Sequence, residues 1–190
     1  MVSCTHMSFL EEFLGSLPKP YISPAVISRH SPIAGIGQFA KRAIEPDEVL
    51  AIEFGPVMDR NVAELVQKRL GYSLDTCVGW GRYSLQGPLD HGGEKGIMNH
   101  SCDPNAGLLG DGIYVSIRPI SEGEEVCVDY GTFETWKGWE MCCNCGAETC
   151  RGVITARDYQ LPDLQRRLGK WFAPYLRNYL EETAPNPPHL

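Results

Sequence analysis

The chain has 190 residues, of which 43% are hydrophobic and 22% are charged. This composition is ordinary for one globular domain with a core, and it excludes a disordered chain. The net charge of −7 argues against general binding of nucleic acid, because a phosphate-binding surface needs a basic face. An acidic surface is compatible with a basic peptide partner, although it can equally serve solubility alone.

No stretch of the sequence approaches the roughly 18 uninterrupted apolar residues of a membrane span. The first twenty residues contain Glu11 and Glu12 and lack the basic start and apolar run of a signal peptide. We therefore expect an intracellular protein, cytoplasmic or nuclear, that contacts neither a membrane nor nucleic acid directly.

The 20 glycines and 14 prolines favour short strands and irregular loops over a helical bundle. A short helix is predicted within residues 1–20 from apolar residues at helical spacing, namely Phe9, Leu10, Phe13, Leu14 and Leu17. Residues 21–29 mix aromatic and β-branched residues with Pro24, which predicts an edge strand. Residues 49–57 form a second apolar segment and predict another strand.

A helix is expected over residues 60–70, with Asp59 as its cap and Gly71 as its stop. Val62, Leu65, Val66 and Arg69 are spaced for one face of this helix. Residues 72–89 predict short strand-like pieces separated by glycines. Residues 106–109 and 113–117 flank Gly110-Asp111-Gly112, which is a strong hairpin signal.

Residues 125–128 predict one more short strand. The C-terminal region carries an apolar stripe of helical period, made of Leu164, Leu168, Trp171, Phe172, Tyr175, Leu176, Tyr179 and Leu180. Pro174 should kink or divide this helix, and the proline-rich tail from residue 183 is expected to be disordered. These elements together predict a mainly β fold with short helices at both ends.

Four of the eight cysteines crowd into residues 142–150, which indicates a metal clip, because disulfide frameworks spread their cysteines along the chain. The spacing Cys-x-Cys-x-x-x-x-Cys offers three thiolates, Cys143, Cys145 and Cys150, whereas structural zinc prefers four ligands. Cys142 is a competing candidate. Cys77 and Cys127 lie in apolar surroundings and should be buried thiols.

Three further motifs have no simple structural explanation. The turn Gly35-Ile36-Gly37 lets the backbone approach a ligand closely, but it lacks the third glycine of a dinucleotide fingerprint. The run from Asn99 to Asn105 reads Asn-His-Ser-Cys-Asp-Pro-Asn and suits neither helix nor strand. The string from Gly123 to Gly131 ends in Asp-Tyr-Gly.

In this order, the glycine turn, the Asn-His-Ser-Cys run, the Asp-Tyr-Gly string and the cysteine cluster resemble the SET domain. SET domains are a family of S-adenosylmethionine-dependent protein-lysine methyltransferases, and the resemblance covers roughly residues 22–152. It implies small curved sheets around a knot-like crossing. The implied division is an N-terminal helical segment (1–20), the SET domain (21–135), a post-SET zinc segment (136–152), a C-terminal helical segment (153–182) and a tail (183–190).

The resemblance also implies roles for individual residues. S-adenosylmethionine would be bound by Gly35, Ile36 and Gly37 together with Asn99, His100 and Tyr130. His100 would be a ligand contact and a structural strut, and it would not act as a general base. The zinc ligands would be Cys102, Cys143, Cys145 and Cys150, because the cysteine of the Asn-His-Ser-Cys run supplies the fourth thiolate in such domains.

Tyr130 is the expected catalytic residue. Lysine methylation is a direct displacement at a sulfonium methyl group, so the enzyme must present a neutral amine in line and exclude water. A free lysine has a pKa of about 10.4, and an apolar channel beside a cationic sulfonium lowers it. A tyrosine hydroxyl can then orient the amine without acting as a strong base.

Two positions depart from the family pattern. Val128 stands where many members carry Phe or Tyr, which leaves the degree of methylation open, and the lead-in at residues 95–98 is altered. The expected partner is a protein or peptide with an accessible lysine, the histone tail being the family's usual substrate. Alternatives are a SET-fold catalyst for a small amine or metabolite, which would need a closed pocket, and an inactive zinc-stapled binding module.

Overall fold

The structure is a computed structural model, and it describes residues 21–53, 55–70, 72–88 and 98–183. The helix predicted within residues 1–20, residues 95–97 of the altered lead-in, and the tail from residue 184 lie outside the described residues. Among the helices that the structure describes, none combines the length and the apolar character that crossing a membrane requires.

Strands dominate the described chain, as the composition predicts. One four-stranded sheet has the order β1 (Tyr21–Ile22), β4 (Val49–Ile52), β10 (Ile113–Ser116) and β9 (Ala106–Gly110). A second has the order β2 (Val26–His30), β3 (Ile36–Ala40), β11 (Glu125–Val128) and β8 (Asn99–His100). A three-stranded sheet follows the order β5 (Val57–Asp59), β7 (Arg82–Pro88) and β6 (Tyr72–Gly79), and β12 (Glu140–Cys142) pairs with β13 (Val153–Thr155).

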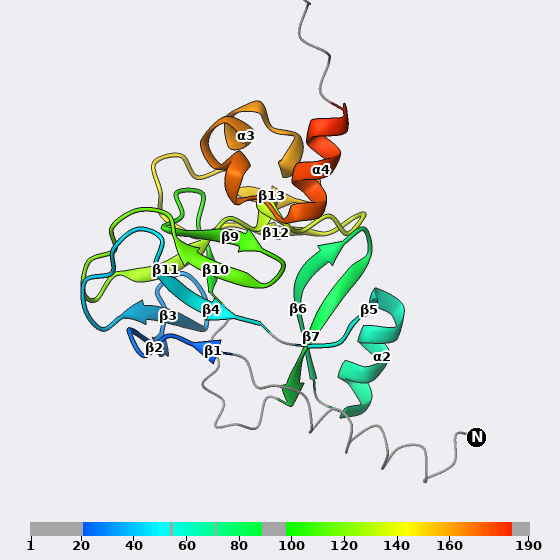
Figure 1. Ribbon diagram of the computed structural model, residues 1–190, viewed down its shortest axis with the longest axis horizontal. Coiled ribbons are helices and arrows are strands. Elements are labelled where there is room, and N and C mark those ends of the chain that lie inside the picture. Colours follow the sequence, from blue (N-terminus) through cyan, green and yellow to red (C-terminus); the bar gives the residue numbers. More distant parts are fainter. Residues whose placement is uncertain (1–20, 54, 71, 89–97, 184–190) are drawn as a thin grey trace, which may run out of the picture.

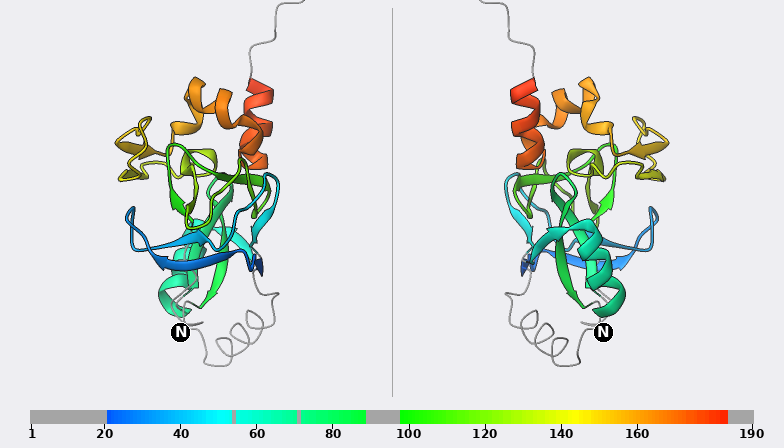
Figure 2. Two further views of the ribbon diagram at one scale, coloured as in Figure 1. Left: turned by 90° about the vertical axis from the view of Figure 1, so that its left-hand side faces the viewer. Right: turned by 90° about the vertical axis from the view of Figure 1, so that its right-hand side faces the viewer.

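The described helices are short. They are α2 (Arg60–Leu70), α3 (Pro162–Leu168) and α4 (Pro174–Thr183), with 3-10 turns η1 (Tyr130–Thr132), η2 (Asp158–Gln160) and η3 (Gly169–Trp171). The β5–β7–β6 sheet and α2 lie on one side of the two four-stranded sheets, and α3 and α4 lie across one end (Figure 1). The views in Figure 2 show the same C-terminal helices at the end opposite to α2.

β8 and β11 form a parallel pair, here called the crossing, with Asn99 opposite Cys127 and His100 opposite Val128. The buried side chain of Asn105 binds the backbone of β11 in this crossing. Its Oδ1 accepts the backbone N–H of Cys127 at 2.8 Å, and its Nδ2 donates to the Glu125 carbonyl at 2.7 Å. Polar side chains here satisfy backbone groups that the crossing removes from water.

Two predicted strands are wrong, because each is divided between two sheets. The segment 21–29 breaks into β1 and β2 at a turn around Pro24, where the Ser23 hydroxyl accepts the Ala25 N–H at 3.2 Å. Proline has no N–H for a ladder and suits such a turn. The segment 49–57 likewise ends as β4 at Ile52, and β5 begins at Val57 in another sheet.

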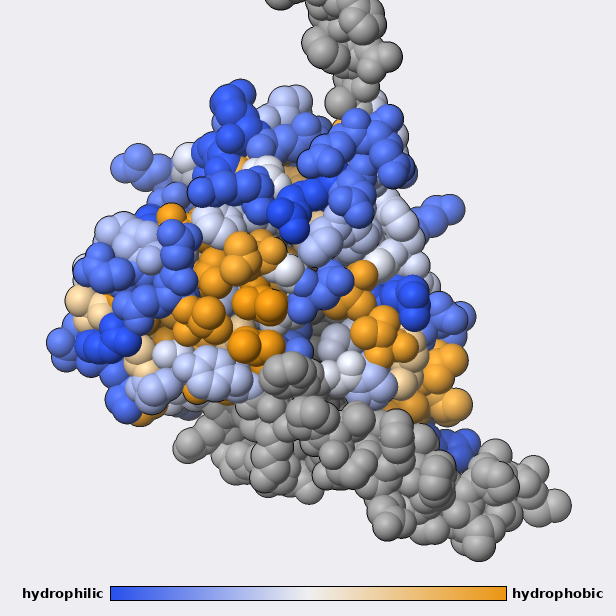
Figure 3. Space-filling view, viewed as in Figure 1, coloured by the Kyte–Doolittle hydropathy of each residue, from blue (hydrophilic) through white to orange (hydrophobic). Residues whose placement is uncertain are grey.

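The bounds of α2 match the prediction, but the large apolar residues spaced for one face are mostly exposed. Val62 and Leu65 are 49% and 53% exposed, whereas the small Ala63 is the side chain fully buried against the sheet. Figure 3 shows apolar surface on the side of the molecule where α2 lies. The strand-like pieces predicted over 72–89 are two longer strands, β6 and β7, joined at Trp80 and Gly81.

The C-terminal stripe predicted from the sequence forms a hydrophobic core against β10. This cluster consists of Val115, Tyr159, Leu164, Leu168, Trp171, Phe172 and Leu176. Pro174 divides the helix as predicted, because α4 begins at that residue. Trp80 also packs its ring edge-to-face against Tyr175 and Tyr179, with centroids 5.5 and 5.2 Å apart. The C-terminal helices therefore pack against β10 of one sheet and against the β6–β7 turn of another.

Candidate functional site

The two glycines of the turn are required for different structural reasons. Gly35 has a positive φ of 48°, which disfavours residues with a Cβ. Gly37 lies within β3, and a Cβ there would collide with the carboxylate of Glu125, with its carboxyl carbon 2.9 Å away. The Ser31 hydroxyl donates to the other carboxylate oxygen at 2.8 Å. Glu125 thus contacts both Ser31 and Gly37 and holds the loop between them in place. The sequence alone did not identify this role.

Asn99 braces the same turn with its side chain. The Asn99 Nδ2 donates to the Ala34 carbonyl at 3.0 Å and to Glu125 Oε1 at 2.8 Å. Both hydrogens of the Asn99 side-chain amide therefore form hydrogen bonds within the protein. Asn99 would then contact a ligand through its backbone or through Oδ1. The structure brings the Gly35–Gly37 turn and Asn99 together, as the sequence analysis expects.

His100 is fully buried between the crossing and the cysteine cluster. Its Nδ1 accepts the backbone N–H of Tyr130 at 3.1 Å, so the hydrogen of the neutral ring is on Nε2, which lies 3.3 Å from Cys102 Sγ. Burial lowers the pKa of His100 to about 4, although the nearby Asp129 opposes this shift. A neutral, fully engaged imidazole fits the expected strut and argues against a general base.

Tyr130 opens the 3-10 turn η1 at the end of β11. Its hydroxyl donates to the Met98 carbonyl at 3.1 Å. The half-buried ring lies among the rings of His100, Phe133 and Trp139, with centroids 5.3, 5.5 and 6.3 Å away. The hydroxyl therefore occupies a fixed position beside the Asn99–His100 pair, in aromatic surroundings.

Four cysteine sulfurs form a cluster of metal-ligand geometry. The Sγ atoms of Cys102, Cys143, Cys145 and Cys150 all lie within 4.8 Å of one another, and the first two are 3.9 Å apart. Tetrahedral zinc with Zn–S bonds of about 2.3 Å places its sulfurs about 3.8 Å apart. Cys142 is exposed and does not belong to this group, while Cys77 and Cys127 are buried as predicted.

Backbone N–H groups surround the cluster sulfurs. The Cys102 N–H points to Cys145 Sγ at 3.5 Å, and the Arg151 N–H points to Cys102 Sγ at 3.3 Å. Burial raises the pKa of the Cys102 thiol to about 11 and also raises that of Cys143. Burial acts in the same direction on Cys145, but N–H donors outweigh it and lower the pKa to about 7. A bound cation would favour the thiolate forms of Cys102 and Cys143.

The central part of the chain is similar to known proteins. The SET domain family matches residues 35–131. The chain is 32% identical to the histone-lysine N-methyltransferase Set2 of Drosophila melanogaster, over 63% of this chain and 6% of that protein. It is 30% identical to the human histone-lysine N-methyltransferase 2B, over 65% of this chain and 5% of that protein.

Among solved structures, a chain of an active polycomb repressive complex 2 in the basal state is similar. The identity is 23%, the match covers 56% of this chain and 15% of that chain, and the TM-score is 0.42. This chain thus spans only a small part of the length of the relatives it matches. The family match covers just over half of the 190 residues and contains the glycine turn, the Asn-His pair and Tyr130. The chain belongs to the SET domain family.

Proposed function

We propose that this protein transfers a methyl group from S-adenosylmethionine to the ε-amine of a lysine in a protein, with Tyr130 as its catalytic residue. One observation carries the proposal: the Tyr130 hydroxyl is held by the Met98 carbonyl next to the Asn99–His100 pair. The curated relatives that match this chain are named histone-lysine N-methyltransferases, which supports the reaction class.

The residues present fit S-adenosylmethionine. Apart from Gly35 and its two chain neighbours, no described atom lies within 4 Å of the place that a Cβ on Gly35 would take, so there is free space beside the backbone of the turn. Gly35, Ile36 and Gly37 would hold the amino-acid part through main-chain groups, and Asn99 and His100 would contact the cofactor largely through backbone atoms. When bound, the cofactor supplies an electrophilic methyl group on a sulfonium.

The protein's own part in the reaction is to position and desolvate the amine. Because the Tyr130 hydroxyl gives its hydrogen to Met98, its oxygen acts toward a substrate as an acceptor. It can accept an N–H of the lysine and so direct the nitrogen lone pair in line with the methyl group. The rings of His100, Phe133 and Trp139 around Tyr130 keep water away and favour the neutral amine.

We further propose that Cys102, Cys143, Cys145 and Cys150 hold one structural zinc, so that residues 136–152 act as a post-SET segment. Four sulfurs at tetrahedral spacing support this assignment. The zinc would cross-link the Asn-His-Ser-Cys run to the segment after the SET region. It would contribute to local folding and take no part in methyl transfer.

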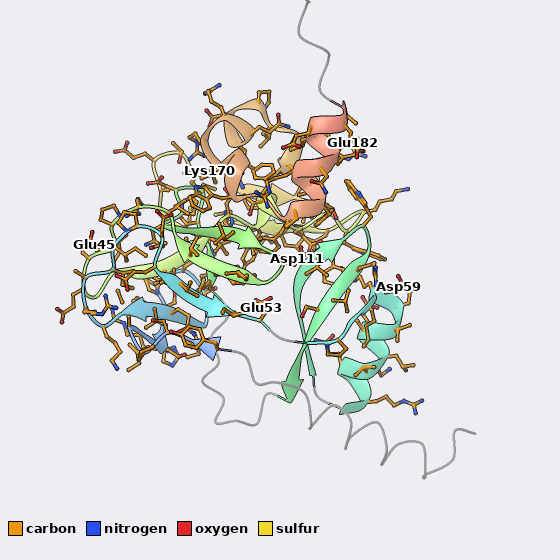
Figure 4. All side chains as sticks on the ribbon, viewed as in Figure 1. Glu45, Glu53, Asp59, Asp111, Lys170 and Glu182 are labelled. Atoms are coloured by element: carbon orange, nitrogen blue, oxygen red, sulfur yellow. The ribbon has the colours of Figure 1, made fainter. Side chains whose placement is uncertain are left out.

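The proposed substrate is a lysine in a basic segment such as a histone tail, which fits a nuclear location. In Figure 4, the labelled acidic side chains Glu45 and Glu53, which lie in loops, and Asp59, the last residue of β5, are far apart. The net negative charge of the chain would favour a basic partner by general steering.

The test is methyl transfer by the purified full chain from isotope-labelled S-adenosylmethionine to core histones and to cell lysate, with mass spectrometry to locate the label. We expect label on lysine side chains, and at least about 100-fold slower labelling with Tyr130→Phe. Cofactor binding without label on any protein would contradict the protein-lysine assignment. Label on small amines would instead favour a metabolite as substrate.

A further inference from the structure

Arg151 connects the cysteine cluster to the turn that carries Tyr130. It follows Cys150 directly, and its backbone N–H donates to Cys102 Sγ at 3.3 Å. Its guanidinium makes a two-point contact with Asp129, from Nη1 to Oδ2 and from Nη2 to Oδ1, both at 2.7 Å. One side chain therefore reaches from the cluster to the residue immediately before Tyr130.

Asp129 in turn fixes the start of η1. Its Oδ1 accepts the Gly131 N–H at 2.9 Å, and its carbonyl accepts the Thr132 N–H at 2.9 Å and the Thr132 hydroxyl at 2.7 Å. The Asp129 side chain has no exposed surface. A movement of this carboxylate would therefore move the backbone on both sides of Tyr130.

Arg151 is also the cation for a second buried carboxylate. Its Nε lies 2.9 Å from Asp158 Oδ2, and that side chain is 8% exposed. His100 Nδ1 lies 3.7 Å from Asp129, but it accepts the Tyr130 N–H and so carries no proton there. Among the described residues, the positive charge next to both carboxylates thus comes from Arg151, whose side chain is 17% exposed.

We propose that Arg151 is a positioning residue that makes the place of Tyr130 depend on closure of the cysteine cluster. This inference rests on the zinc and Tyr130 roles proposed above. With the ligands held together, Cys102 Sγ fixes the backbone of residue 151 and the guanidinium reaches Asp129. With the ligands released, that anchor is lost, Asp129 loses its partner, and the turn loosens. A misplacement of about 1 Å can lower a rate about 10²-fold.

The first test measures the turn without measuring activity. Hydrogen–deuterium exchange of the peptide 129–134 is followed in the full chain, zinc-loaded and after treatment with a zinc chelator. We expect chelation to raise exchange at Gly131 and Thr132 in the wild type. In Arg151→Gln, exchange should already be high, and chelation should add little. Arg166→Gln is the matched control, because Arg166 pairs with Asp163 on the exposed surface of α3, and it should respond like the wild type.

Three results would overturn the inference. Chelation could leave exchange of 129–134 unchanged in the wild type. It could raise exchange equally in β4, which would mean general unfolding. Arg151→Gln could also respond to chelation as fully as the wild type does, which would mean that another contact carries the coupling.

The second test separates positioning from binding. Arg151→Lys keeps the charge but loses the planar two-point contact. If Arg151→Gln fails to fold, Arg151→Lys is the variant to compare with the wild type. We expect kcat to fall about 10²-fold in Arg151→Gln and at least about tenfold in Arg151→Lys. The peptide KM, the cofactor Kd and the zinc content should stay within about threefold of the wild type. An unchanged kcat in folded Arg151→Lys and Arg151→Gln would contradict the role.

The two proposals can fail separately. If exchange at 129–134 depends on zinc and Arg151 as expected but the wild type methylates nothing, the proposed function is wrong and the coupling stands. If the wild type methylates lysine but exchange at 129–134 ignores zinc, the function stands and the coupling is wrong.

Discussion

Glu125 fills the space beside Gly37. A Cβ on residue 37 would lie 2.9 Å from the carboxyl carbon of Glu125 and 3.0 Å from Asn99 Nδ2. The glycine is therefore required by close approach inside a strand, and not by an unusual backbone angle. The same carboxylate ties Ser31 and Asn99 together, so the expected cofactor turn rests on a polar support that spans three segments of the chain.

Gly37→Ala should weaken cofactor binding. The new methyl group must displace the Glu125 carboxylate and break its hydrogen bond to Asn99, which releases the turn. We expect the Kd for S-adenosylmethionine, measured by titration calorimetry, to rise at least about tenfold, equivalent to about 1.4 kcal/mol. The control is Gly169→Ala, because a Cβ there meets no described atom within 4 Å, and its Kd should be unchanged.

The double variant Gly37→Ala with Glu125→Ala tests the cause. If the collision with Glu125 is the reason for the loss, the effects of the two changes will not add, because the second change removes the obstacle created by the first. Strictly additive effects would show that Gly37 acts for another reason.

Tyr130→Phe should lower turnover with little change in binding. The variant removes one oxygen and its hydrogen bond to Met98, while the ring keeps its contacts with Phe133 and Trp139. Loss of one well-placed polar contact in a transition state costs about 10² or more in kcat. Steady-state methylation assays give kcat, and calorimetry gives the cofactor Kd, which should change much less.

Tyr179→Phe is the matched control, since Tyr179 lies on α4 and is partly exposed. It should leave kcat unchanged. Survival of activity within a few-fold in Tyr130→Phe, or joint collapse of folding and cofactor binding, would show that the hydroxyl has no catalytic role.

One zinc per chain should depend on Cys102 and not on Cys142. Cys102→Ser removes a cluster sulfur, so metal analysis should show loss of zinc, and a chelator should loosen residues 136–152 first. Cys142→Ser changes an exposed neighbour of the ligand Cys143 and should keep both zinc and activity. Absence of zinc from the wild type, or full zinc content in Cys102→Ser, would rule out this ligand set.

The sequence was sufficient for elements whose signals are local. The bounds of α2 and β11, the 106–117 hairpin and the break at Pro174 all follow from capping, alternation or proline chemistry. The division of residues 21–29 and 49–57 between sheets was not predictable in the same way. It depends on which strands lie alongside, and a strand's apolar composition does not name its partner.

The candidate site likewise contains residues that the sequence identified and residues that it did not. The sequence motifs identified Tyr130, Asn99 and the cysteines, because these residue types are unusual at such positions in a helix, strand or ordinary loop. Glu125 and Arg151 looked like ordinary charged residues of a strand and a loop. Their roles arise from contacts with residues far away in sequence, Asn99 and Asp129, and only the folded chain brings these partners together.

Asn105→Ala should destabilise the whole domain, because Asn105 satisfies two backbone groups of β11 at the crossing. Its Oδ1 accepts the Cys127 N–H and its Nδ2 donates to the Glu125 carbonyl, with the side chain almost fully buried. Each buried group left without a partner costs about 1–3 kcal/mol, so for two groups we expect a loss of about 2–6 kcal/mol in the free energy of unfolding. Urea unfolding followed by circular dichroism measures this loss. Asn61→Ala, on the exposed side of α2, is the control and should leave stability unchanged or slightly higher, since alanine favours helix. A change below about 1 kcal/mol in Asn105→Ala would mean that water replaces the amide at the crossing.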